Sequence, residues 1–209
     1  MTHRLYTIGH SAMQLSTLLE LLQQFQIRLL VDVRSKPQSF YHPHFDRSEL
    51  ERTLPAAGIA YLFLGEELGG RPDDPEAYAS DGVVDYRTRR KSYAYRAGLE
   101  RVEQELAEHD LALMCAEEDP LECHRFLMIC PDLVAAGLEP LHIRKGGILE
   151  TQRETEDRLL EAQQFGAVAG ASLFSGDRAA ALESAYDAQA RQCAFRIEPA
   201  EGRWTSLSR

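Results

Sequence analysis

The chain has 209 residues, of which 44% are hydrophobic, so it is long enough to bury one sizeable core with residues left over for an appendage. Its formal net charge of -10 disfavours a protein that coats DNA or an anionic membrane through bulk charge. No apolar run approaches the roughly 20 residues that span a bilayer and no apolar signal core opens the sequence, so we expect no membrane partner and a cytoplasmic protein with reduced cysteines.

Short apolar runs alternate with amphipathic segments along most of the chain. The runs predict five strands, over residues 5–9, 27–33, 59–65, 111–117 and 138–145. The amphipathic segments predict helices over 15–25, 47–58, 92–109 and from Pro120 to about 136. Apolar strands joined by helical crossovers indicate a parallel sheet. We therefore predict an α/β fold of three layers, with about five mainly parallel strands and helices on both faces.

The character of the sequence changes after Gly147. We predict an α/β domain over 1–148 and a helical C-terminal extension over 149–209 that packs on it. Within the extension, 151–164 and 177–192 are expected to be helical, and 165–176 reads as a linker of small residues. The linker contains "GASLF" (170–174), which partly resembles the pentapeptide that docks on the bacterial sliding clamp, without its leading glutamine.

Polar residues follow nearly every predicted strand. In open parallel sheets, ligands bind beyond the carboxyl ends of the strands, so these residues are expected to meet at one edge. His10, Arg34 and Glu117 closely follow strands, and Arg125 falls near the start of the next helix. The pattern predicts one shared pocket that holds all four.

The stretch "CAEEDPLECHR" (115–125) combines thiols, carboxylates, a histidine and an arginine. Asp119 suits an N-cap and Pro120 a first helical position, so Cys123 is expected in the first turn of a helix, where the helix dipole and nearby cations favour a thiolate. Cys123 is therefore a candidate nucleophile. Its alternative is a small buried side chain that only packs.

The same stretch does not match the spacing of familiar metal sites. Cys115, Cys123 and His124 fit none of the usual Cys-x₂₋₄-Cys or His-x₃₋₅-His pairs, so we expect no metal and no cofactor. A cysteine inside a helical turn also disfavours sulfur transfer of the rhodanese type, in which a tight loop cradles the thiol.

Four motifs make a family resemblance recognisable: "TIGHS", "VDVRSKPQSF", "GIAYLFLGEELGGRP" and "CAEEDPLECHR". In this order they resemble the family known as domain of unknown function 488, over roughly residues 4–148. The resemblance implies a compact α/β domain with its motif residues at one sheet edge. Carried over residue by residue, it points to His10, Ser11, Asp32, Arg34, Gly69, Gly70, Arg71, Glu117, Cys123, His124 and Arg125.

A basic segment stands out in this acidic chain. Residues 85–101 combine six arginines and lysines with three tyrosines, as a surface for phosphates or single strands does. The alternative is a solvated helix start with its tyrosines half buried.

Two functions are compatible with these residues. The first is an enzyme for a phosphorylated small molecule, nucleotide or nucleic-acid end, with catalytic groups His10, Glu117, Cys123 and His124 and with an anion held by Arg34, Arg71, Arg125 and their neighbours. The second is a non-catalytic module that binds a nucleotide or nucleic acid. We favour the enzyme because acids and thiols converge with the arginines. Nucleic acid and a homodimer remain open as partners.

Overall fold

One six-stranded sheet forms the centre of the protein, in a computed structural model that describes residues 3–164 and 175–197. Its order is β3-β2-β4-β1-β5-β6. The strands are β1 (Leu5–Gly9), β2 (Leu29–Asp32), β3 (Ala60–Phe63), β4 (Leu111–Cys115), β5 (Leu141–Ile143) and β6 (Leu149–Thr151). The first five are parallel, and β6 pairs antiparallel with β5.

The α/β fold predicted from the sequence is confirmed, with one more strand than the five expected. The additional strand, β6, is only three residues long and reads Leu-Glu-Thr, with its middle residue buried. A segment this short carries no alternation that distinguishes a strand from the start of a helix.

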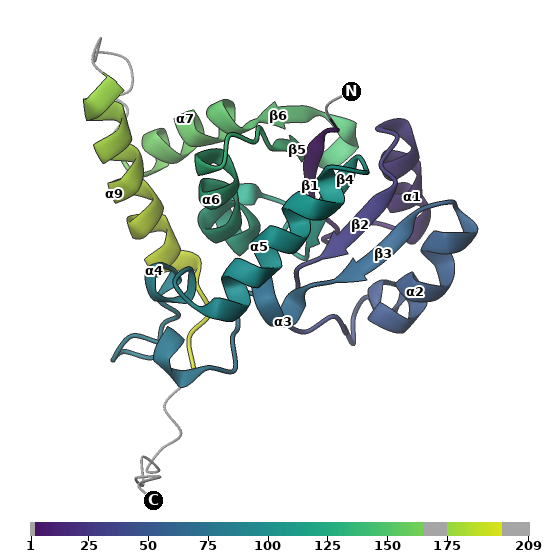
Figure 1. Ribbon diagram of the computed structural model, residues 1–209, viewed down its shortest axis with the longest axis horizontal. Helices are drawn as coiled ribbons and strands as arrows, with labels where there is room; N and C mark the ends of the chain where they lie inside the picture. Colours follow the sequence, from purple (N-terminus) through teal and green to yellow (C-terminus); the bar gives the residue numbers. More distant parts are fainter. Residues whose placement is uncertain (1–2, 165–174, 198–209) are drawn as a thin grey trace, which may run out of the picture.

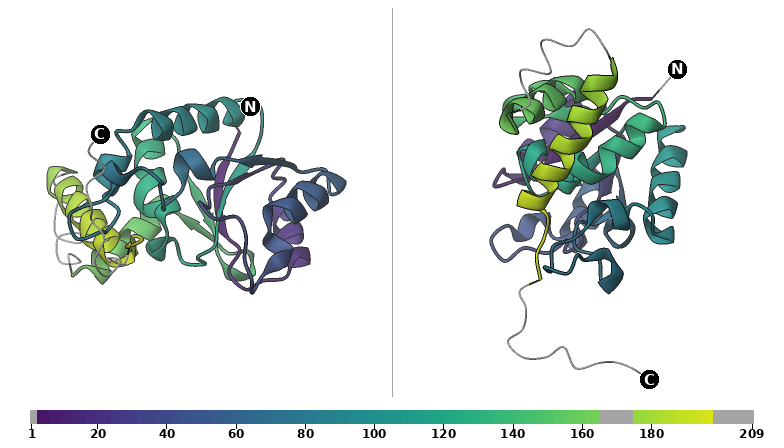
Figure 2. Two further views of the ribbon diagram at one scale, coloured as in Figure 1. Left: turned by 90° about the horizontal axis from the view of Figure 1, so that it is seen from below. Right: turned by 90° about the vertical axis from the view of Figure 1, so that its left-hand side faces the viewer.

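Helices cover both faces of the sheet. They are α1 (Leu15–Gln24), α2 (Arg47–Ala56), α3 (Gly65–Leu68), α4 (Tyr86–Arg89), α5 (Tyr93–Leu106), α6 (Cys130–Ala135), α7 (Gln152–Ala162) and α9 (Ser175–Cys193), with short 3-10 turns at Pro43–Phe45, Pro75–Ala77 and Lys145–Gly147. α1 and α2 lie on one face, and α5 and α6 lie on the other (Figures 1 and 2).

This division of the helices follows from the strand order. The chain moves from β1 to β2 to β3 in one direction across the sheet and then returns through β4 to β5 in the other. Because parallel crossovers are right-handed, the two directions place their helices on opposite faces. β1 and β4 are neighbours whose connections leave in opposite directions, so a crevice opens beyond their carboxyl ends.

The core consists of two apolar layers, one on each face of the sheet. Every residue of β1 and β4 is buried, as expected of central strands covered on both sides. Helix α1 buries Leu18, Leu21 and Leu22, which share one face at helical spacing. Each such side chain contributes roughly 1.5–3 kcal/mol when it leaves water.

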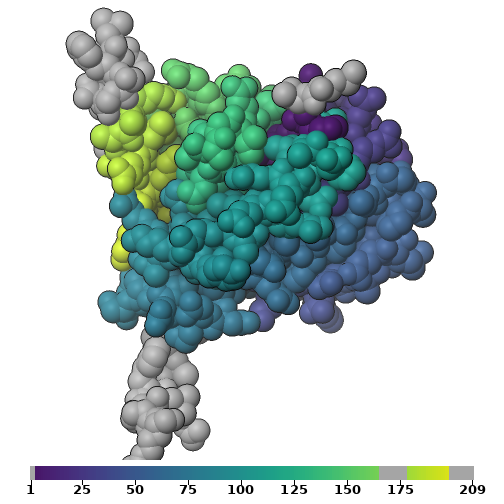
Figure 3. All heavy atoms as spheres, viewed as in Figure 1, coloured from purple at the N-terminus to yellow at the C-terminus, as the bar shows by residue number. Residues whose placement is uncertain are grey.

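The C-terminal segments complete one side of the molecule. α7 begins with a capping box between Thr151 and Glu154, and it packs against α9 beside α6 (Figure 1). α9 closes the edge of the surface that α5 and α6 form (Figure 3). Beyond α9, Arg196 pairs with Val83 in an antiparallel bridge.

Most of the predicted linker over 165–176, including the "GASLF" sequence, lies outside the described residues. Among the helices that the structure describes, none is long and apolar enough to cross a membrane.

A buried histidine couples β5 to the rest of the fold. His142 Nδ1 lies 2.8 Å from the Thr7 hydroxyl, and its Nε2 lies 3.1 Å from Gln152 Oε1. Burial, together with the charge of Arg125, lowers the pKa of His142 to about 3. The unfolded chain therefore binds a proton at this residue at a pH where the folded protein does not, and stability falls as the pH drops from about 6.5 toward 3.

We predict that His142→Gln weakens this acid sensitivity. Between pH 7 and pH 5, wild type should lose about 2 kcal/mol more of its free energy of unfolding than the variant does, as measured by urea denaturation. His109→Gln, a change at an exposed site, is the matched control and should behave as wild type. An NMR titration of His142 near the ordinary value would contradict the prediction.

Candidate functional site

A pocket of about 640 Å³ opens where the carboxyl ends of β1, β2 and β4 meet. Its lining comes from the segments that follow these strands, from the glycine loop after α3, from Tyr86 and from the end of α9. The lining includes His10, Ser11, Arg34, Lys36, Gly70, Arg71, Cys115, Glu117, His124, Cys193 and Phe195. Most of the predicted site residues therefore share one pocket.

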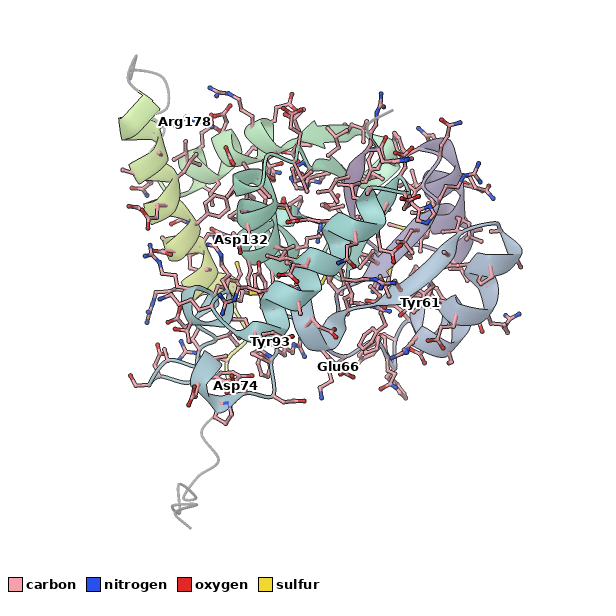
Figure 4. The ribbon with its side chains drawn as sticks, viewed as in Figure 1. Tyr61, Glu66, Asp74, Tyr93, Asp132 and Arg178 are labelled. Carbon is pink, nitrogen blue, oxygen red and sulfur yellow. The ribbon has the colours of Figure 1, made fainter. Side chains whose placement is uncertain are left out.

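One wall of the pocket is a buried ion pair. Asp32, at the end of β2, is fully buried and accepts hydrogen bonds from the Arg34 Nε and Nη2 atoms at 2.9 and 2.6 Å. It also accepts one from the Tyr61 hydroxyl at 2.8 Å; Tyr61 on β3 is labelled in Figure 4. This bidentate pair leaves Asp32 behind the pocket wall and occupies much of the Arg34 guanidinium.

His10 is held neutral by the same wall. Its Nδ1 lies 2.9 Å from the Ser11 carbonyl, which can only accept, so this nitrogen carries the proton. Its Nε2 then accepts from Arg34 Nη1 at 3.1 Å. Burial and the charge of Arg34 lower the pKa of His10 to about 4. Both ring nitrogens of His10 are hydrogen-bonded, so the ring is a fixed part of the pocket wall. To transfer a proton, His10 would have to break its hydrogen bond to Ser11 or to Arg34.

The turn after β1 is tight. A side chain at Gly9 would put its Cβ 1.7 Å from the Glu117 carbonyl oxygen, so only glycine fits against the loop after β4. Ser11 adopts a positive φ of 43° and donates its backbone N–H to the Ala116 carbonyl at 2.8 Å. These contacts bring the loops after β1 and β4 together at the pocket.

The "GGR" motif presents Arg71 to the pocket. A Cβ on Gly69 would lie 2.2 Å from Ser35 Oγ, and one on Gly70 would lie 2.9 Å from the His124 ring. The glycines thus allow the loop to pass against the site. The Arg71 N–H donates to Ser35 Oγ at 2.8 Å, and its guanidinium lies 4.7 Å from the Phe195 ring centre, in a cation–π contact.

At the other side of the pocket, Cys115, Glu117, Cys123 and His124 form a cluster, here called the thiol cluster. One ligand atom from each residue lies within 4.8 Å of all the others. Cys115 Sγ is 3.0 Å from Glu117 Oε2 and 3.6 Å from His124 Nδ1, and Cys123 Sγ is 3.9 Å from the same nitrogen. His124 Nε2 donates to the Val33 carbonyl at 2.9 Å, which leaves Nδ1 facing the two sulfurs.

The predicted helix from Pro120 to about 136 is wrong in its first part. A 3-10 turn, Pro120–Glu122, is followed by an extended Cys123, a π-helical turn, Arg125–Ile129, and then α6. The Asp119 cap is present, accepting from Leu121 N–H at 3.0 Å. Cys123, however, precedes the second helical segment as its N-cap, because its carbonyl accepts from the N–H groups of Phe126 and Leu127.

Because Cys123 is an N-cap and does not lie inside a helical turn, the argument from the sequence against sulfur transfer of the rhodanese type no longer applies. The Arg125 N–H donates to its sulfur at 3.4 Å. Nevertheless Cys123 is only 1% exposed and does not line the pocket, whereas Cys115 does. Direct attack by Cys123 would require the cluster to open.

The charges of the thiol cluster are coupled. Burial alone raises the pKa of Cys123, but the Cys115 thiol and the positive charges of Arg125 and His124 lower it well below its ordinary value. Burial and the neighbouring Cys123 raise the pKa of Cys115. The pKa of His124 is raised, because the charge on Cys123 outweighs the burial of the ring. Burial, and then Cys123, also raises the pKa of Glu117.

Arg125 does not line the pocket but stands behind the thiol cluster. Its side chain is fully buried, and its Nη1 and Nη2 atoms donate to the carbonyls of Glu117 and Glu118 at 2.6 and 2.7 Å. Its Nε lies 3.4 Å from the Thr7 hydroxyl on β1. The guanidinium of Arg125 therefore does not face the pocket, and the prediction that it binds the anion directly is wrong. Its contacts instead hold the loop that carries Glu117.

Several residues that line the pocket were not predicted as site residues, among them Lys36, Tyr86, Cys193 and Phe195. Lys36 could have been found, because it lies two positions after Arg34 beyond the same strand. Tyr86 belongs to the basic segment, whose composition predicts a separate surface. Cys193 and Phe195 follow no strand of the sheet, and no sequence signal connects the end of α9 to the pocket.

The basic segment is largely used inside the molecule. Arg87 pairs with Glu183 and Asp187 of α9, and the buried Arg89 donates to the carbonyls of Glu66 and Glu67. Arg90 pairs with Asp132 of α6, which Figure 4 labels between the helices. These arginines attach α4 to its neighbours, which leaves fewer of them for an external phosphate.

Comparison with known proteins identifies a family for most of the α/β domain. The family described as "Domain of unknown function DUF488" matches residues 14–129. The matched segment includes Asp32, Arg34, the glycine loop and the whole thiol cluster. No curated protein matches the chain, and no solved structure matches it.

We predict that Arg125→Lys destabilises the protein by about 2–4 kcal/mol, because one ammonium group cannot donate to both carbonyls from the position of the guanidinium. The free energy of unfolding in urea is the measurement. Arg47→Lys, at a half-exposed site on α2, is the matched control and should change stability by less than about 0.5 kcal/mol. Equal effects of the two substitutions would contradict a structural role for Arg125.

We predict that Cys193 is the fastest thiol to react in the folded protein, because it is partly exposed while Cys115, Cys123 and Cys130 are buried. A chromogenic disulfide reagent should show one fast phase, which Cys193→Ser removes and the control Cys130→Ser retains. Loss of the fast phase in Cys123→Ser instead would show that the thiol cluster is open to solvent.

Proposed function

The chain belongs to the DUF488 family, and we propose that it is an enzyme that acts on a phosphate-bearing small molecule or nucleotide, with the thiol cluster as the reactive side of its pocket. The observation that carries the proposal is the shared pocket. The same cavity is lined by Lys36 and Arg71 and by Cys115, Glu117 and His124. A bound anion would therefore lie within reach of acid–base and thiol groups.

The cations best suited to an anion are Lys36 and Arg71. Among the residues that the structure describes, neither forms an ion pair, whereas Arg34 is paired with Asp32. A guanidinium fork can donate two parallel hydrogen bonds to a phosphate, and an ammonium group adds a compact charge. Arg34 supports the site by fixing His10 and the wall behind the anion.

The composition of the pocket favours catalysis over simple binding. A module that only holds phosphate gains from cations and loses from a nearby carboxyl group, yet Glu117 lines the same cavity. Carboxyl, thiol and imidazole groups are the usual carriers of proton transfer and covalent chemistry. The convergence of these groups at one pocket supports a reaction at the thiol cluster.

The second candidate is a binding module for a nucleotide or nucleic-acid end. It uses the same cations without turnover. The intramolecular pairs of Arg87 and Arg90 reduce the support for an extended nucleic-acid surface at the basic segment. A small phosphate-bearing ligand requires only the pocket.

We predict that inorganic phosphate and adenosine monophosphate, used as probes, bind wild type in a calorimetric titration. Arg71→Gln should weaken each dissociation constant by about tenfold, because one charge-assisted contact is worth about 1.4 kcal/mol. Arg52→Gln, at an exposed site on α2, is the matched control and should bind as wild type. Binding that is equal in Arg71→Gln and wild type would exclude this pocket as the anion site.

Catalysis is tested separately from binding. A panel of phosphorylated metabolites and nucleotides is incubated with wild type and with Glu117→Gln, and products are followed by phosphorus NMR. The enzyme hypothesis requires turnover of at least one compound, with a loss of about 100-fold or more in Glu117→Gln while probe binding remains. Probe binding without turnover of any panel member would support the binding module instead.

A further inference from the structure

The thiol cluster has the composition and shape of a metal centre. We propose that Cys115, Cys123 and His124 bind a zinc ion, with Glu117 at the fourth position, on the pocket side. The inference rests on the proposed function and deepens it, because it names a cofactor for the thiol cluster of the same pocket. Zinc binding can nevertheless be measured without any substrate, so the two proposals can fail separately.

The distances in the thiol cluster support a single small ion. In a tetrahedral zinc site with Zn–S near 2.3 Å and Zn–N near 2.0–2.1 Å, neighbouring ligand atoms lie about 3.5–3.8 Å apart. His124 Nδ1 lies 3.6 and 3.9 Å from the sulfurs of Cys115 and Cys123. The Glu117 oxygen lies 3.0 Å from Cys115 Sγ, and all four atoms fall within 4.8 Å of one another.

The imidazole is already oriented as a zinc ligand. Its Nε2 donates to the Val33 carbonyl at 2.9 Å, at the end of β2, so the lone pair of Nδ1 faces the sulfurs. Metal-bound histidines commonly donate their second nitrogen to a carbonyl or a carboxylate in this way. Gly70 packs against the same ring, where a Cβ would lie 2.9 Å from it, and this restricts the ring further.

The surrounding charges also fit a divalent ion. Two thiolates and one carboxylate are balanced by zinc together with the buried guanidinium of Arg125, which stands behind the cluster. Two sulfurs and one imidazole are soft and borderline ligands, which favour zinc over magnesium or calcium. Cys115, Glu117 and His124 line the pocket, so the ion has a path of entry and the fourth position faces the cavity.

The spacing of these four residues in the sequence matches no familiar zinc motif, so the sequence did not predict the cluster. Familiar zinc motifs bring two ligands from one short loop. Here Cys115 ends β4, Glu117 lies in the following loop, and Cys123 follows the 3-10 turn with its carbonyl bonded to the next helical segment. The 3-10 turn and the extended Cys123 bring the chain back to the end of β4. A zinc ion would add a Lewis acid beside the bound anion.

The test is zinc binding by full-length protein stripped with a chelator and kept reduced with a phosphine. Competition with a chromogenic zinc indicator should give one site per chain. Cys115→Ser, Cys123→Ser and His124→Asn should each weaken the dissociation constant by about 100-fold or more, and Glu117→Gln by about tenfold. Cys130→Ser is the matched control, because this thiol lies outside both the cluster and the pocket lining, and it should bind as wild type.

Cobalt substitution separates lost ligands from lost folding. Cobalt in wild type should show thiolate charge-transfer absorption in the near ultraviolet, and a folded single cysteine variant should keep about half of it, because each thiolate contributes its own band. Circular dichroism checks the fold of each variant. The inference is overturned if folded wild type binds zinc no more tightly than the Cys115→Ser/Cys123→Ser double variant, or if cobalt gives no thiolate band. Phosphate binding by the stripped protein would then still stand as support for the proposed function.

Discussion

The site depends on one buried positive charge. The Arg125 guanidinium has no contact with water, and an uncompensated ion in such a place would cost several kcal/mol, so the structure must surround it with acceptors and negative charge. The carbonyls of Glu117 and Glu118 satisfy two of its donors, which fixes the loop after β4. Arg125 in turn helps to lower the pKa of Cys123, which favours a negative charge on the nearby sulfur. The geometry of the loop and the ionisation of the thiol thus have a common origin.

The two sides of the pocket differ in how their charges are arranged. On one side, Asp32 and Arg34 neutralise each other and hold His10 without a charge, which gives a rigid wall with a fixed hydrogen-bonding pattern. On the other side, charge is shared among sulfur, imidazole and carboxyl groups whose protonation states depend on one another. A ligand between them would meet a fixed surface and an adaptable one. This contrast explains how many titratable residues can share one small volume.

The fold was largely predictable, because apolar runs of strand length and amphipathic segments of helix length are local signals. The rule that ligands bind beyond the carboxyl ends of parallel strands also predicted that His10, Arg34 and Glu117 share one pocket. Arg125 shows where such reasoning ends, since sequence position cannot tell whether an arginine beyond a strand faces the cavity or the core. The extended conformation of Cys123, between a 3-10 turn and the next helical segment, is likewise not encoded by helix propensity. The same holds for Phe195, whose place in the pocket is decided by the packing of α9.

The contribution of Cys193 and Phe195 to the pocket has a consequence for biosynthesis. A ribosome makes the strands and the thiol cluster first and adds these residues more than 65 positions after His124. Until α9 has emerged and docked, the nascent chain carries an open crevice with Arg71 lacking its aromatic partner. The pocket is therefore completed only after α9 has been synthesised and has docked on the earlier part of the chain.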